Sequence, residues 1–429
     1  MGFNWIDGLI VVAYLIAITL FGIHFRRKQQ SIHTYFLGGK TIPAWALSLS
    51  IVATETSTLT VIGTPGIAFG GNLSFLQLVL GAEGVRVLAI ATVVSVVLGT
   101  GDIWSILIIS GLTLIYTFEG GLTAVIWTDV VQLFIYISGT LVAFFVILGL
   151  IPGGWQGVLA NAGQKLTIWN FSTGLTIPYT FWAGIIGGAF LNTASHGVDQ
   201  LIVQRLLAAK NERDSKVALL SSGLVILFQF TLFLIVGVML YSFYQYNPHE
   251  PVPGMRDRIF PTFVVQHLPH GVSGLMIAAI LAAAMANLSS AINSLASTTV
   301  VDFYRTFVTG GVTSKDELRL SRWITVLWGL VLVFLAILSR GVQSVLEAGL
   351  TIASITYGSM LGVFLLGVLT RRANERGSIV GMTAGLLSML AVWYFTSIAF
   401  TWYVLIGSVI TFSVGYAASY IYDLRDEAA

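Results

Sequence analysis

The feature that most constrains this chain is a series of apolar runs of about 20 residues, the length that an α-helix needs to cross a membrane. Only 9% of the residues are charged and 56% are hydrophobic, whereas a soluble domain carries about 25% charged residues. The runs are Trp5–Phe25, Ile42–Phe69, Leu73–Gly99, Ile103–Phe118, Leu122–Leu150, Ile177–Leu207, Val217–Tyr246, Val272–Thr299, Trp323–Leu338, Leu346–Leu369, Ile379–Phe395 and Ala399–Tyr420. The sequence therefore predicts an all-α membrane protein with roughly 12–13 transmembrane helices.

The composition excludes several other classes of protein. There are no cysteines, so we expect neither a disulfide framework nor a thiolate metal site. The net charge of +2 is too small to indicate nucleic-acid binding. The sequence has no G-x-x-x-x-G-K-S/T phosphate-binding loop and no His-Glu-x-x-His motif, so we expect neither an enzyme nor an ATP-driven pump. We expect one transmembrane domain over residues 1–429, surrounded by the lipid bilayer and without an obligatory protein partner.

The distribution of basic residues predicts the orientation of the chain. Most of the 21 Lys and Arg residues follow the first, sixth, eighth and tenth runs. Short cytoplasmic loops carry an excess of Lys and Arg, so these segments are predicted to face the cytoplasm. The amino terminus is then outside the cell membrane and the carboxyl terminus is cytoplasmic. The first run lacks a small-residue cleavage motif, so we interpret it as a retained helix.

One apolar run conflicts with this orientation. An even number of crossings must separate the second run from the sixth, whereas three runs lie between them. The run Leu73–Gly99 is the suspect, because the segment Gly81–Arg86 interrupts it. We predict that the pieces around residues 72–81 and 82–99 belong to two different helices. Whether residues are missing between Gly81 and Ala82 stays open, and the alternative is one long tilted helix beside a re-entrant segment.

The second run is unusually polar at its centre. Between Thr54 and Thr60 it holds five hydroxyl residues, one carboxylate and one leucine. Polar groups at membrane depth are costly, and they commonly mark ion or substrate pathways. The pattern predicts a discontinuous helix, in which unwound carbonyls and hydroxyls bind an ion between two half-helices. The alternative is an intact helix whose hydroxyls bond back to its own carbonyls.

Further polar positions lie inside other runs. Asp129 lies near the inner end of its run and is interpreted as an ion ligand, a proton carrier or half of a salt bridge. In the eighth run a polar stripe shares one helical face and serves either to join helices or to bind an ion. The stripe consists of Ser290, Asn293, Ser294 and Ser297.

The sixth run holds a third polar group near its inner end. Its asparagine, Asn192, is placed where it could face a substrate. Asp199 and Arg205 follow within the same run, and we predict that they take part in a network near the inner gate.

Several segments, in order along the chain, resemble a known family. They are Tyr35–Lys40, Ala53–Gly63, Gly120–Gln132, Asp199–Arg205, Asn287–Asp302 and Val363–Gly367 with Arg371. Together they resemble the sodium:solute symporter family, which includes sodium/glucose, sialic acid, monocarboxylate, multivitamin and iodide transporters. The resemblance covers nearly the whole chain. It implies a LeuT-like inverted repeat of five plus five helices and sodium-coupled symport by alternating access.

The resemblance also implies a first sodium site. This site would use backbone carbonyls of Ala53, Thr56 and Ala283, with Ala286 and Asn287 where the family has a pair of hydroxyls. The chain departs from the family here. Ala286 offers no side-chain ligand, whereas Asn287 could offer its amide oxygen.

A second sodium site and the substrate positions follow from the same resemblance. The second site falls on Asp129, Ser289 and Ser290. The substrate positions fall on Ser57, Thr60, Gln77, Asn192, Ser195, Leu350, Thr351 and Ser354. One or two co-transported sodium ions are therefore expected.

Three functions are compatible with these observations. The first is sodium-coupled symport of a small polar organic solute or anion. The second is a proton-coupled transporter of the same fold that uses Asp129 or Glu55, and the third is a transporter-like membrane sensor. The substrate positions carry no charge, which favours hydrogen bonding to a small polar solute or half-helix dipoles that hold an anion.

Overall fold

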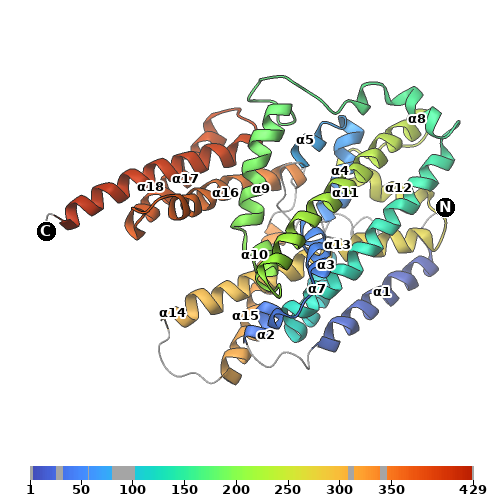
Figure 1. The fold of residues 1–429 in the computed structure, drawn as a ribbon. Coiled ribbons are helices and arrows are strands. Elements are labelled where there is room, and N and C mark those ends of the chain that lie inside the picture. Colours follow the sequence, from blue (N-terminus) through green and yellow to red (C-terminus); the bar gives the residue numbers. More distant parts are fainter. Residues whose placement is uncertain are drawn as a thin grey trace. The chain divides into compact units, whose positions relative to one another are not determined.

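The chain is almost entirely helical in the computed structural model, which describes residues 3–25, 32–56, 58–79, 102–307, 314–338 and 345–427 (Figure 1). Eight helices in these ranges are long and apolar enough to cross a membrane, or up to nine if the bent pair Ala44–Glu55 (α3) and Thr58–Gly70 (α4) counts as one span. The predicted all-α, multi-pass architecture is confirmed. The count of 12–13 stays a prediction, because most of the disputed segments around residues 72–81 and 82–99 lies outside the described residues.

The described residues fall into two compact units. The first holds those of Met1–Asn72, Arg86–Leu166 and Gln204–Leu346. The second holds those of Leu73–Val85, Thr167–Val203 and Glu347–Ala429. Each unit therefore combines segments that lie far apart in the sequence.

The first unit is built around one buried helix, α13. Its helices, besides α3 and α4, are α1 (Trp5–His24), α2 (Ile32–Leu37), η2 (Gly38–Lys40), α7 (Asp102–Leu150), α8 (Trp155–Ala162), η3 (Gly163–Leu166), α11 (Glu212–Tyr246), η5 (Arg256–Arg258), α12 (Ile259–His267), α13 (Val272–Ser297), η6 (Thr298–Tyr304), α14 (Arg305–Phe307) and α15 (Ser314–Leu338). Helix α13 packs against α1, α3, α4, α7 and α15, and α11 packs against α3 and α4. The many alanines and serines of α13 permit this close packing.

Two glycines in the first unit are required by backbone geometry. Gly121 interrupts α7 with the non-helical angles φ 54° and ψ −159°, so the expected runs on either side of it are two helical segments that meet at this residue, and the second, Gly121–Leu150, is long enough to span a membrane by itself. A Cβ atom at Gly237 of α11 would lie 2.2 Å from the carbonyl oxygen of Pro65 in α4. The absence of a side chain there lets α11 approach the second half of the broken span.

The second unit is assembled from a helical hairpin and shorter pieces. Its helices are α5 (Phe75–Val79), η4 (Ala183–Gly187), α9 (Gly188–Gly197), α16 (Val345–Leu369), α17 (Glu375–Phe395), η7 (Phe400–Trp402) and α18 (Tyr403–Glu427). Helix α18 packs along α17, and the Cα atom of its Gly407 would lie 2.9 Å from a Cβ atom placed on Gly358 of α16. Helix α10 (Gln200–Leu207) contributes residues to both units.

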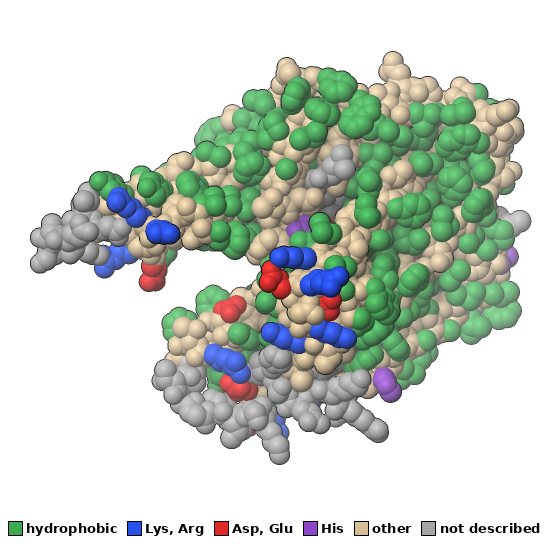
Figure 2. All heavy atoms as spheres, viewed as in Figure 1, with side chains coloured by type: hydrophobic (Ala, Val, Ile, Leu, Met, Phe, Trp, Pro, Cys, Tyr) green, Lys and Arg blue, Asp and Glu red, His purple; other side chains and the backbone are tan. Residues whose placement is uncertain are grey.

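The surface of the helices is apolar over wide areas. Figure 2 shows hydrophobic side chains across most of the visible face, whereas Lys, Arg, Asp and Glu gather in a few patches. Large exposed apolar side chains include Trp5 of α1, Leu220 and Leu224 of α11, and Phe334 of α15. A soluble protein rarely exposes contiguous apolar surface on this scale, so these faces are suited to lipid.

Candidate ion and substrate site

The second apolar run is broken where the sequence predicts. Helix α3 ends at Glu55, and Thr56 takes the non-helical angles φ −82° and ψ 86°. Helix α4 leaves at 56° to α3. Carbonyl oxygens of α3 and N–H groups of α4 therefore point towards the break, with opposite ends of the two helix dipoles. The predicted discontinuous helix is confirmed and the intact-helix alternative is wrong; Ser57 lies outside the described residues.

Three backbone carbonyl oxygens meet at the side chain of Asn287 in α13. Its Nδ2 atom donates to the carbonyl oxygens of Thr56 at 2.8 Å, Ala283 at 3.0 Å and Ala53 at 3.4 Å. All four residues are buried. Four residues of the first predicted sodium position are thus brought together, and the amide nitrogen of Asn287, rather than its oxygen, lies among the carbonyls.

The neighbouring residues of α13 direct their hydrogen bonds elsewhere. The carbonyl oxygen of Ala286 accepts from the hydroxyls of Ser289 at 2.9 Å and Ser290 at 2.7 Å. Within the part of the chain that the structure describes, Oδ1 of Asn287 is buried and has no hydrogen-bond partner. The methyl group of Ala286 offers no oxygen ligand.

Helix α11 braces the broken end of α3. The Nε2 atom of Gln229 donates to Oγ1 of Thr56 at 2.5 Å. That hydroxyl in turn donates to the carbonyl oxygen of Val52 at 2.7 Å. The side chain of Thr56 is therefore held on one side of the break while its carbonyl oxygen faces Asn287 on the other.

A second cluster surrounds Asp129 of α7. Its Oδ2 atom accepts from Oγ of Ser50 at 2.6 Å and from Nη2 of Arg205 at 2.9 Å. Arg205 also donates to Ser50 through Nε, at 2.8 Å, and to the hydroxyl of Ser290 through Nη2. Oγ1 of Thr54 lies 3.4 Å from Oγ of Ser290. The cluster joins α3, α7, α10 and α13.

This second cluster is a buried ion pair. The side chains of Asp129 and Arg205 are 0% and 1% exposed. A carboxylate or guanidinium at this depth is tolerated only when paired. Asp129 therefore takes the salt-bridge role that the sequence left open, and its partner is Arg205. Asp199, which was grouped with Arg205, instead accepts a hydrogen bond from the Tyr357 hydroxyl.

The predicted substrate residue Gln77 is engaged by its own unit. Its Nε2 atom donates to the carbonyl oxygens of Ser74 at 3.2 Å and Tyr179 at 3.3 Å. Its Oε1 atom accepts from the backbone N–H of Asn170 at 3.3 Å. These bonds connect α5 to the segment that precedes η4.

The substrate residues of α9 lie one turn apart. Oγ of Ser195 donates to the carbonyl oxygen of Asn192 at 3.3 Å and lies 2.9 Å from Nδ1 of His196. Both residues belong to the second unit. Thr60, by contrast, is buried in the first unit.

The remaining substrate residues lie on α16 in the second unit. Leu350 and Ser354 are buried. Thr351 lines a groove with Thr356 of the same helix and Trp393 of α17. The substrate role of all these residues stays a prediction.

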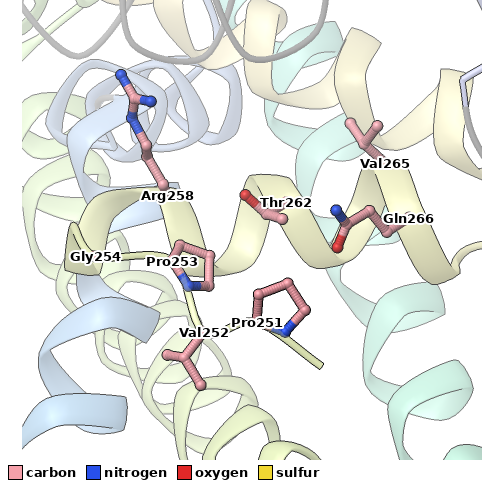
Figure 3. Close-up of a pocket in the computed structure, with 8 residues that line it drawn as sticks. All are labelled: Pro251, Val252, Pro253, Gly254, Arg258, Thr262, Val265 and Gln266. Atoms are coloured by element: carbon pink, nitrogen blue, oxygen red, sulfur yellow. The ribbon is translucent and has the colours of Figure 1, made fainter. Parts of the chain in front are cut away.

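A pocket in the first unit lies away from both clusters. Figure 3 shows it between the segment 251–254 and α12, from which Thr262 and Gln266 present polar atoms. No predicted site residue lines it. Among the described residues, no group of three or more His, Cys, Asp or Glu side chains is placed to hold a metal ion. The predicted ion positions instead contain carbonyls, hydroxyls and one carboxylate.

Comparison with known proteins gives concordant results. The sequence pattern of the sodium:solute symporter family matches residues 71–385, more than half of the chain. The sodium/sialic acid symporter SiaT of Proteus mirabilis is 26% identical over 95% of this chain and 93% of its own. The sodium/sialic acid symporter NanT of Aliivibrio fischeri is 28% identical over 96% of this chain and 93% of its own.

A solved structure also matches. The substrate-bound, outward-open state of a Na⁺-coupled sialic acid symporter superposes with a TM-score of 0.85 at 25% identity, covering 97% of this chain and 98% of that chain. The LeuT-like fold implied by the resemblance is thereby confirmed. The chain belongs to the sodium:solute symporter family and is a sodium-coupled symporter.

Proposed function

We propose that this symporter carries a small polar organic solute or anion by alternating access, and that Na⁺ acts at Asp129. The observation that carries the proposal is the buried cluster of Asp129, Arg205, Ser50 and Ser290 beside the broken span. A carboxylate and hydroxyls are oxygen ligands of the kind that hard cations bind. Ser289, one residue before Ser290, completes the ligand set that we assign to this site.

Charge balance couples the binding of Na⁺ at Asp129 to the release of Arg205. One buried carboxylate compensates one monovalent cation, and a second cation beside it would leave an unpaired positive charge. Na⁺ that binds at Asp129 therefore displaces the guanidinium of Arg205. Arg205 connects the last turn of α10 to α3, α7 and α13. Its release therefore removes the bonds that hold α10 against these three helices.

The solute class follows from the uncharged substrate positions. Thr60, Asn192, Ser195, Thr351 and Ser354 offer hydroxyl and amide groups. The first turn of α4 supplies the positive end of a helix dipole, which favours an anion. The two relatives named above are sodium/sialic acid symporters, so we place sialic acid first among the solutes to test.

Uptake by purified protein in liposomes tests this proposal. An inward Na⁺ gradient is compared with equimolar choline at equal pH on both sides, with sialic acid, small carboxylates, sugars and amino acids as labelled solutes. We expect accumulation of at least one solute with Na⁺ only. In a second arm, choline is combined with an inward proton gradient, and accumulation there without Na⁺ would contradict the proposal and favour proton coupling. The matched charge control for Asp129→Asn is Glu317→Gln, which changes a partly exposed ion pair with Arg305.

We also propose that the amino terminus lies outside the cell and the carboxyl terminus in the cytoplasm, in one transmembrane domain that needs no protein partner. Because the chain has no cysteine, single cysteines can be introduced without a background. His249→Cys in an outer segment is expected to react with an impermeant maleimide on intact cells, and Lys210→Cys only after permeabilisation. The reverse pattern would overturn the orientation.

A further inference from the structure

The broken end of α3 presents a position that suits a positive group. Ala53 and Thr56 supply carbonyl oxygens from the carboxyl-terminal end of a half-helix, where the helix dipole is negative. Ala283 of α13 supplies a third oxygen from the opposite side. Three carbonyl oxygens that converge in a buried place favour a cation or an N–H donor between them, because their partial negative charges would otherwise face one another.

The side chain of Asn287 already supplies that group. Its Nδ2 atom lies 2.8–3.4 Å from all three oxygens, within the range of N–H···O contacts. The reversed amide would place Oδ1 against three carbonyl oxygens, so the hydrogen-bond pattern fixes the orientation. Oδ1 instead points away and finds no partner among the described residues. The amide therefore satisfies the three carbonyl oxygens through its nitrogen, while its own oxygen is left without a hydrogen bond among the described residues.

Two described residues beside the amide, Ala286 and Thr56, offer an ion no free side-chain ligand. Ala286 has only a methyl side chain, and its carbonyl oxygen accepts from Ser289 and Ser290. The hydroxyl of Thr56 is held by Gln229 and Val52 on the other side of the break. An ion at this position would have to displace the amide and would add a net positive charge to the buried cluster.

We infer that the carboxamide of Asn287 is a built-in donor that takes the place of an ion at the break, so that this protein binds a single sodium ion, at Asp129. The inference rests on the Asp129 site of the proposed function and fixes its stoichiometry. It also makes the break indifferent to Na⁺, because a covalently attached donor already lies between the carbonyl oxygens of Ala53, Thr56 and Ala283.

The test is equilibrium binding of radioactive ²²Na⁺ to the purified full-length protein. We expect one ion per chain for the natural protein and none for Asp129→Asn. Ala286→Ser with Asn287→Ser removes the amide and adds two hydroxyls, and we expect two ions per chain. Asn287→Asp keeps the shape of the side chain and replaces the donor with a carboxylate, so it is expected to gain a second ion as well.

A matched control is available on the same helix. Asn293 is buried in α13 and contacts none of the three carbonyls, so Asn293→Ser is expected to keep one ion. The elution profile of each variant in detergent checks that it is folded, and Asn287→Asp serves if the double variant is not.

The outcomes separate the inference from the proposed function. Two ions in the natural protein, or one ion that Asn287→Ala removes and Asp129→Asn retains, would overturn the inference. The inference is also overturned if the double variant Ala286→Ser with Asn287→Ser and the variant Asn287→Asp are both folded and each still binds one ion per chain. No ion in the natural protein and one in those variants would support the role of the Asn287 amide at the break but contradict the proposed ion at Asp129.

Discussion

Two clusters on α13, centred on Asn287 and Ser290, lie three residues apart and satisfy buried oxygen atoms with different kinds of donor. Around Asn287, a neutral amide donates to three backbone carbonyls. Around Ser290, the charged Arg205 is paired with the carboxylate of Asp129. A cation can exchange with a guanidinium without changing the net charge, but it cannot replace an amide without adding charge. Asp129 can therefore exchange its cationic partner, whereas the amide of Asn287 is a fixed donor.

The largest effect is expected from Asp129→Asn. It leaves the guanidinium of Arg205 buried without its carboxylate, which costs about 3–5 kcal/mol of unfolding free energy. Sodium-driven uptake should be lost. Chemical unfolding in detergent and liposome uptake measure the two effects.

The double variant Asp129→Asn with Arg205→Gln separates stability from coupling. Removing both charges should restore most of the unfolding free energy, because no unpaired ion is left. Uptake should stay absent. A double variant that regains sodium-driven uptake would show that the pair is structural only.

Ser290→Ala is expected to have the next largest effect. The hydroxyl accepts from Arg205 and donates to Ala286, and a hydrogen bond to a charged group contributes about 1.5–3 kcal/mol. Ser289→Ala is the matched control, because the hydroxyl of Ser289 donates only to Ala286 among the described contacts. Equal loss of stability in the two variants would place Ser290 outside the charged cluster.

Asn287→Ala tests the neutral cluster. It removes the side-chain donor that three buried carbonyl oxygens share, and an unsatisfied buried group costs about 1–3 kcal/mol. Because an ion can then enter the space, the loss should be smaller in Na⁺ than in choline. Thermal unfolding in the two salts measures the difference. A loss of stability that is the same in both salts would argue against a cation-like role for the amide.

Gln229→Met is expected to have the smallest effect. It keeps the length of the side chain and removes the hydrogen bond to Thr56, which contributes about 0.5–1.5 kcal/mol. Uptake should fall modestly while the sodium dependence of uptake is unchanged. A changed sodium dependence would show that α11 takes part in ion binding at the break.

The architecture was predictable because it depends on local pattern. Apolar runs predict helices that span a membrane, and five hydroxyls and a carboxylate between Thr54 and Thr60 predict the break. The resemblance also placed Ala53, Thr56, Ala283 and Asn287 in one site, and the structure brings them together.

The pairing inside the clusters was not predictable. Asp129 and Arg205 are 76 positions apart, and no periodicity of one helix relates them. The sequence suggested a ligand role for the amide oxygen of Asn287, but the orientation of an amide depends on which groups face it. Three carbonyls face Asn287, and this requires the nitrogen. Long-range packing therefore decided which cluster is charged.

The most direct test of the account is the number of sodium ions moved per solute. Simultaneous fluxes of ²²Na⁺ and the labelled solute into liposomes give this ratio. We expect one sodium ion per solute, carried at Asp129. A ratio of two, reduced to one by Asn287→Ala, would contradict it, because the position at the break would then carry an ion.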